Sequence, residues 1–193
     1  MKTQLSLVIA ATLFLSCAGE VGRQAANIPG WSSESGGTLI QEASQARFPP
    51  RYGELIRGHH QNYDSAGHNG SVSYDKSNPH LRVTIYVYPI RHGNYDPSEE
   101  FREAVEDAVQ ATGGTVDSYQ PLSIRRESQA VDGYLASLTW VRSGESIVSW
   151  VGLVPSNNWY YKVHATTSME NDGAAQSASA AVTILQDVLF GAR

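Results

Sequence analysis

The chain has 193 residues and a formal net charge of −5 at pH 7, which leaves room for one domain and an extension. Acidic residues outnumber basic ones and no basic stripe occurs, so the composition argues against nucleic acid as a partner. The single cysteine excludes an internal disulfide, and the fold must therefore be held by packing.

The first residues have the pattern of an export signal. Lys2 supplies a positive charge, and the apolar run LSLVIAATLFL over residues 5–15 is too short to span a bilayer as a helix. We expect a signal peptide over residues 1–16.

The apolar run ends at Cys17, the only cysteine of the chain. The stretch Ser16-Cys17-Ala18 resembles the lipobox of bacterial lipoproteins, although Phe14 and Leu15 depart from its usual pattern. The resemblance implies acylation of Cys17 by diacylglycerol and a fatty acid such as palmitate, and attachment to a membrane through that lipid. No Asp follows Cys17, which favours the outer membrane, on the side that faces the periplasm. The alternative is an ordinary signal peptide cut near Ala18, which would leave a soluble periplasmic or secreted protein.

The segment behind Cys17 is rich in Gly, Ser, Ala and Gln, and its few large apolar residues are Trp31, Leu39 and Ile40. This composition predicts a flexible, lipid-anchored tether over residues 17–47. The prolines after Phe48 mark the start of a single domain over residues 48–193.

Three strands are expected first in this domain. Alternating β-branched and aromatic residues predict a strand over residues 81–88, LRVTIYVY, with both faces at least partly covered. Residues 53–63 and 70–75 predict two earlier strands, joined by a turn-forming link.

A helix is expected after Asp96. Asp96 can cap the free N–H groups, Pro97 suits the first turn, and Gly113 with Gly114 ends the pattern. Between them, apolar residues from Phe101 to Val109 recur at helical spacing on one stripe.

Four strands and a second helix complete the domain. Residues 116–126, 133–142, 146–154 and 159–166 alternate or are β-rich, and residues from about 171 to 190 have apolar side chains at helical spacing. The order βββαββββα predicts an α+β fold, with two main helices packed on a twisted antiparallel sheet of about six to seven strands.

Element order, small size and export together resemble the PsbP-like and DcrB-like superfamily. More closely, the segments FPPRYGELIRGHHQNYDSAGHNGSVSY, VTIYVYP and WYYKVHAT resemble an uncharacterised group of proteobacterial envelope lipoproteins. These motifs are structural. The resemblance therefore implies a fold and a place in the envelope, and no reaction.

Six histidines raise the question of a metal site. His60, Asp64 and His68 on the predicted first hairpin are the candidates, whereas neighbouring histidines on a strand point to opposite faces. The alternative is a set of polar residues on a solvated hairpin. No metal and no cofactor is predicted, because no nucleotide-binding, zinc-protease or nucleophile-elbow motif occurs.

The strand over residues 159–166 alternates an apolar set with Tyr160, Lys162 and His164. The apolar set suits a core, and the second set is the candidate face for a ligand or partner. We therefore expect a non-enzymatic binding or assembly-supporting module, with an envelope protein or a small amphipathic molecule as its partner. The alternative function is a metal-dependent hydrolase that uses the hairpin of His60, Asp64 and His68.

Overall fold

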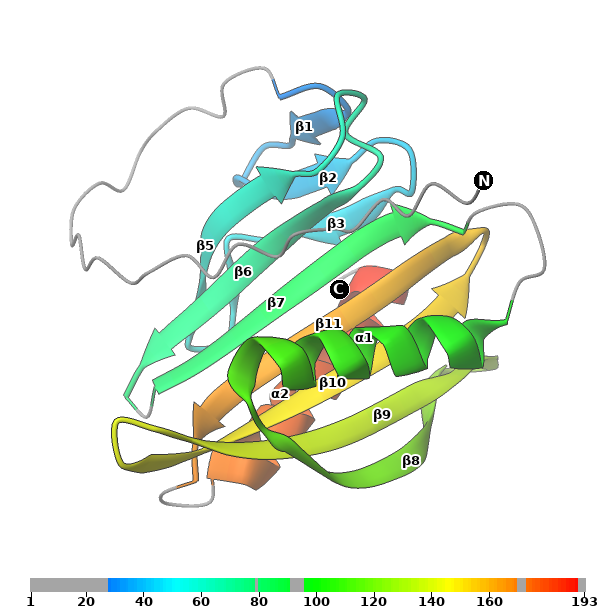
Figure 1. Ribbon diagram of the computed structural model, residues 1–193. Helices are drawn as coiled ribbons and strands as arrows, with labels where there is room; N and C mark the ends of the chain where they lie inside the picture. The colour runs from blue at the N-terminus through cyan, green and yellow to red at the C-terminus, as the bar shows by residue number, and fades with distance from the viewer. Residues whose placement is uncertain (1–27, 79, 91–95, 170–172, 191–193) are drawn as a thin grey trace.

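The structure is a computed structural model and describes residues 28–78, 80–90, 96–169 and 173–190. Within them, two helices pack on opposite faces of an eight-stranded antiparallel sheet, and a small three-stranded sheet lies at one end (Figure 1). The predicted α+β class is confirmed.

The strand order of the large sheet is β4-β5-β6-β7-β11-β10-β9-β8. The bounds of these strands are β4 Arg51–Tyr52, β5 Leu55–Asn62, β6 Gly70–Ser77, β7 His80–Pro89, β8 Thr115–Arg126, β9 Gln129–Arg142, β10 Glu145–Ser156 and β11 Trp159–Ser168. The sheet is larger than the six to seven strands predicted, since a short edge strand, β4, precedes β5.

The strand order also differs from a simple meander. After β7 the chain crosses one face through α1, Pro97–Thr112, reaches the far edge at β8, and returns strand by strand until β11 pairs with β7. Alternation of side chains along a strand predicts its two faces but not its neighbour, which is why this central pair was not predicted.

Both ends of α1 form as predicted. The side chain of Asp96 accepts a hydrogen bond from the Ser98 N–H at 2.9 Å, and Pro97 occupies the first turn. Gly113 closes the helix in the left-handed conformation, with φ 69° and a hydrogen bond from its N–H to the Val109 carbonyl.

The second helix, α2, spans Gly173–Phe190 and packs on the other face of the sheet. Its buried residues Ala181, Ile184, Leu185 and Val188 meet the inward side chains of β7 and β11, among them Val83, Ile85 and Val163. The larger of two apolar clusters lies here, and the smaller one lies under α1.

The prediction of a flexible tether up to residue 47 is wrong for residues 28–47. This stretch, with Phe48, holds three strands, β1 Trp31–Ser33, β2 Leu39–Gln41 and β3 Ala46–Phe48, which pair antiparallel. Trp31, Leu39 and Phe48 are buried in the main cluster. The few large apolar residues of a Gly- and Ser-rich stretch are enough to dock it, because neighbouring turns bring them onto one side. The rest of the predicted tether, residues 17–27, and the signal over residues 1–16 lie outside the described residues.

One buried side chain fastens the small sheet to the large one. The Gln41 amide donates to the main-chain carbonyls of Gly67, His68 and Val87 at 3.2, 3.0 and 3.3 Å, and Gln41 has no exposed surface.

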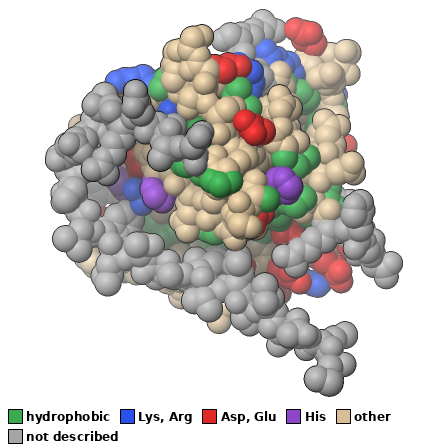
Figure 2. Space-filling view, turned by 90° about the horizontal axis from the view of Figure 1, so that it is seen from above, with side chains coloured by type: hydrophobic (Ala, Val, Ile, Leu, Met, Phe, Trp, Pro, Cys, Tyr) green, Lys and Arg blue, Asp and Glu red, His purple; other side chains and the backbone are tan. Residues whose placement is uncertain are grey.

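Seen from above, this end of the molecule displays mainly main chain and uncharged polar groups, with scattered hydrophobic and charged side chains between them (Figure 2).

Candidate functional site

Helix α1 covers only half of the sheet face on which it packs. Its buried residues Phe101, Ala104, Val105 and Ala108 pack on β9 and β10. The strand residues beneath it are apolar or aromatic and join the same cluster, namely Ala136, Leu138, Val151, Leu153 and Tyr160. This half of the face is an ordinary core layer.

The other half of the same face, on β6, β7 and β11, is polar. The register aligns Ser71 with Tyr86 and Lys162 in one row, and Ser73 with Thr84 and His164 in the next. We call the polar half-face the set Ser71, Ser73, Thr84, Tyr86, Tyr88, Lys162, His164 and Thr166. Most of these side chains are half-buried, whereas the intervening residues of β7 and β11 are buried on the α2 side. In the described residues, α1 packs on the apolar half, and Tyr88, at the boundary, also contacts the cluster under α1.

Lys162 is the central charge of the polar half-face. Its Nζ lies 4.7 Å from the centre of the Tyr86 ring and 5.8 Å from that of Tyr88, which are cation–π distances. Burial lowers the pKa of Lys162, while Glu100 and Asp107 on α1 act in the opposite direction. Lys162 forms no ion pair with another described residue. The cations that do form ion pairs in the described part of the chain are Arg47, Lys76, Arg82 and Arg102.

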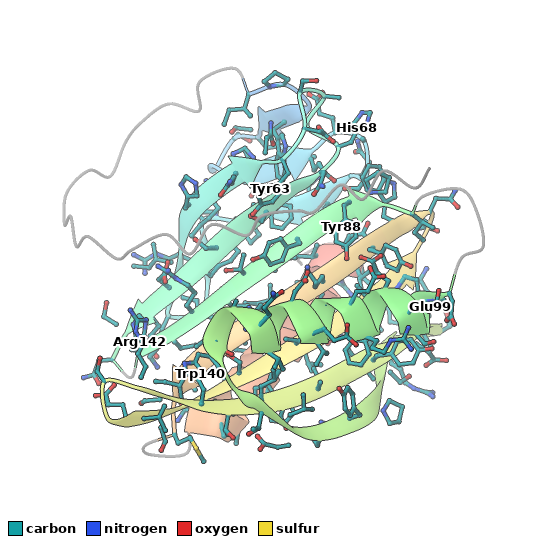
Figure 3. All side chains as sticks on the ribbon, in the orientation of Figure 1. Tyr63, His68, Tyr88, Glu99, Trp140 and Arg142 are labelled. Carbon is teal, nitrogen blue, oxygen red and sulfur yellow. The ribbon has the colours of Figure 1, made fainter. Side chains whose placement is uncertain are left out.

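Two tyrosines flank this cation. The Tyr88 hydroxyl donates to Glu100 Oε1 at 2.8 Å, and burial followed by the Glu100 charge raises the pKa of Tyr88. Burial raises the pKa of Tyr86 to about 12. The Tyr63 ring lies nearly parallel to that of Tyr86 with 6.3 Å between centres, and Tyr63 is 39% exposed. Figure 3 shows Tyr63 and Tyr88 on the same broad side of the sheet as α1.

His164 belongs to a small hydroxyl network. Its Nε2 lies 3.2 Å from Ser149 Oγ, which in turn is 2.7 Å from Thr166 Oγ1. Burial, with a smaller contribution from the charge of Lys162, lowers the pKa of His164 to about 4. His164 is therefore a neutral hydrogen-bonding group at neutral pH.

This network predicts a loss of stability in mild acid. Between pH 6.5 and about 4 the unfolded chain binds a proton at residue 164 that the folded chain does not, so the free energy of unfolding falls as the pH falls. We expect the effect at His164 to be about 2 kcal/mol across this window, allowing for partial exposure. Urea unfolding at a series of pH values measures it. The His164→Asn variant should show a shallower dependence, with the remainder due in part to His60, whose pKa is also lowered by burial. An unchanged slope in the variant would contradict the assignment.

Tyr160 does not belong to the accessible face. Although it alternates with the core residues of β11 as predicted, it is only 4% exposed and packs in the apolar cluster under α1. Its ring contacts that of Tyr88 with 5.3 Å between centres. The three predicted contact residues are thus divided, with Lys162 and His164 on the polar half-face and Tyr160 beneath the helix.

The predicted hairpin residues have separate surroundings. The His60 ring packs against Trp31 with 4.2 Å between centres, and the His68 ring lies edge-on to Trp159 at 6.4 Å. The Asp64 carboxylate accepts main-chain N–H bonds from three residues of its own loop, Ala66, His68 and Asn69. Within the described ranges no group of three His, Cys, Asp or Glu side chains is arranged to hold a metal ion.

A shallow hollow of about 760 Å³ lies beyond the end of α1. It is lined by residues of β8, β9 and the α1 end, including Thr112, Asp117 and Trp140. Asp117 is the one ionisable side chain among the lining residues that the structure describes.

Sequence reasoning missed several members of the site. Thr84 and Ser149 are ordinary strand residues by pattern, and Glu100 looks like a helix-start acid. Tyr63 is the last residue of the strand predicted over residues 53–63, and it lies just beyond the end of β5. The alternation of β7 did indicate a second face with Tyr86 and Tyr88, but only the pairing of β7 with β11 brings these rings to Lys162. Cys17 lies outside the described residues, and among those described no helix is both long and apolar enough to cross a membrane.

Comparison with known proteins assigns no family. No family model and no curated protein matches the chain. Among solved structures, a protein of unknown function named PA94 from Pseudomonas aeruginosa is 11% identical, with a TM-score of 0.42 over 72% of this chain and 86% of the other. LpqN of Mycobacterium tuberculosis, involved in cell envelope biogenesis, is 11% identical, with a TM-score of 0.40 over 58% of this chain and 67% of the other.

Proposed function

We propose that this protein is a lipoprotein of the bacterial cell envelope, anchored through lipid on Cys17 in the outer membrane and facing the periplasm. There it acts as a non-enzymatic binding module for an envelope component, through the polar half-face. The observation that carries the proposal is the unequal covering of the sheet. Within the described residues, one helix buries the apolar half of a face, and no helix packs on the polar half.

The energetics of Lys162 support a binding role. A half-buried ammonium loses hydration. Two tyrosine rings at 4.7 and 5.8 Å, together with the charges of Glu100 and Asp107, replace it only in part, because burial still lowers the pKa of Lys162. Such a group gains from a ligand that supplies the missing polar contacts. Polar groups held on a rigid sheet also bind with little loss of conformational entropy.

The docked small sheet shortens the link to the proposed anchor. Ile28 already packs against the main cluster, so the link covers residues 18–27 instead of reaching to residue 47. At about 3.5 Å per residue these ten residues reach at most roughly 35 Å. The module would then work close to the membrane surface.

Site-specific photocrosslinking in intact cells tests the proposal. A benzophenone amino acid at Tyr63, beside the polar half-face, should form a crosslink that weakens when Lys162 is replaced by Gln. The matched control is the same probe at Tyr119, an exposed tyrosine on the edge strand β8. Palmitate labelling of the same cells should mark the wild type and be lost in Cys17→Ser.

Equal crosslinking from Tyr63 and Tyr119, or a Tyr63 crosslink indifferent to Lys162, would contradict binding by this face. Absence of palmitate from the wild type would remove the anchor and leave the binding role to be judged by the crosslinks alone.

A further inference from the structure

The polar half-face combines three chemical features that together select a class of ligand. They are a row of hydroxyl groups, a tyrosine platform, and one cation without an ion pair among the described residues. Each feature comes from different side chains, and the pairing of β6, β7 and β11 places them in adjacent rows.

The hydroxyl groups lie in the rows next to the cation. Ser73 and Thr84 are paired across β6 and β7, and Thr166 lies two residues beyond His164 on β11. Ser73 already bonds the main chain of His59, and Thr166 already bonds Ser149. A hydroxyl oxygen can accept two hydrogen bonds, so these groups keep acceptor capacity for a partner that is itself rich in hydroxyl groups.

The tyrosine platform is Tyr63 together with Tyr86. Their rings are nearly parallel, at an interplanar angle of 21°, and the Tyr63 hydroxyl is fixed by Ser71 Oγ at 2.9 Å. Aromatic faces bury apolar C–H groups while their polar ends remain hydrogen-bonded, which suits a ring that carries both C–H and O–H groups.

The positive charge of Lys162 favours a ligand with a negative charge. The neighbouring cation Arg82 is bonded to the Asp75 carboxylate at 2.6 Å, whereas Lys162 has aromatic neighbours. Glu100 is engaged by the Tyr88 hydroxyl at the edge of α1. A ligand carboxylate would find its complement at Lys162.

From these features we propose that the polar half-face binds an acidic oligosaccharide, with one sugar carboxylate paired to Lys162 and a sugar ring beside Tyr63 and Tyr86. This inference rests on the proposed binding role and names its ligand class. An extended peptide is a poorer occupant because β6, β7 and β11 are paired on both edges, so no free strand edge is available to hydrogen-bond its main chain.

The test is calorimetric titration of the full-length Cys17→Ser protein with trigalacturonic acid. The neutral galactotriose, an acetylated triglutamate peptide and inorganic phosphate are titrated in parallel. We expect the acidic trisaccharide to bind, the other three to bind at least tenfold more weakly, and added salt to weaken the interaction.

Substitution of single lysines tests whether Lys162 itself binds the ligand. Lys162→Gln should weaken binding of the acidic trisaccharide by about tenfold or more, the usual loss for a charged contact. Lys76→Gln is the matched control, since Lys76 pairs with Glu54 away from this surface. It should bind as the parent does. Thermal unfolding of each variant checks that the fold is kept.

Equal binding of the neutral and acidic sugars would overturn the role of Lys162, and binding of the peptide or phosphate as tight as that of the sugar would overturn the ligand class. If no probe binds while the Tyr63 crosslink persists in cells, the saccharide inference falls and the binding role stands.

Discussion

Replacing Trp31 by Ala is expected to lower the free energy of unfolding by about 3–4 kcal/mol. Trp31 is 6% exposed, and its ring lies 5.7 Å from that of Phe48 and 4.2 Å from that of His60, measured between centres. Its removal would leave a cavity between the small sheet and β5. Chemical denaturation of the full chain measures the change.

The neighbouring exposed residue Ser33, on the same strand, provides the control, because Ser33→Ala should alter the free energy of unfolding by less than about 0.5 kcal/mol. A Trp31→Ala chain as stable as the Ser33→Ala chain would mean that residues 28–47 behave as the tether first predicted.

The second large effect is expected at Gly67, where Gly67→Ala should cost about 3 kcal/mol or more. Gly67 has φ 74°, in the left-handed region, and a Cβ built on it would overlap the Pro29 carbonyl oxygen and approach Gly30 Cα to 3.0 Å. The obstructing atoms are main chain and cannot rotate away. The small sheet would have to shift from the β5–β6 loop.

A substitution at Gly53 separates the penalty of positive φ from the cost of the steric overlap. It also has positive φ, 58°, but a Cβ there meets nothing within 4 Å. Gly53→Ala should therefore show only the conformational penalty, about 1 kcal/mol. Equal losses of thermal stability in the two variants would show that the close approach at Gly67 contributes nothing.

The parts of the fold that could be predicted are those with local causes. The bounds of α1 follow from Asp96, Pro97 and Gly113, whose conformational preferences act within one turn. Most strands follow from alternation and from short turns, such as the one between β9 and β10.

The parts that could not be predicted depend on distant segments. The docking of the small sheet requires Gln41 to reach the Val87 carbonyl, 46 residues away. The burial of Tyr160 depends on where α1 lies, and alternation along β11 indicates two faces without saying which part of either is covered. The candidate site was therefore predicted in part, through Lys162 and His164, and the groups around them became visible only with the strand order.

The pairing of β7 with β11 has a consequence for how the protein folds. Thr84 lies opposite His164, so the middle of the sheet joins segments about eighty residues apart, and β11 is the last strand in the described part of the chain. Such long-range pairing forms slowly, because a large loop must close before the contact stabilises it. Until β11 is made, β7 has one open edge, with the residue sequence RVTIYVY on it. A chaperone that assists folding before β11 has paired would therefore have to shield this edge of β7 from other strands.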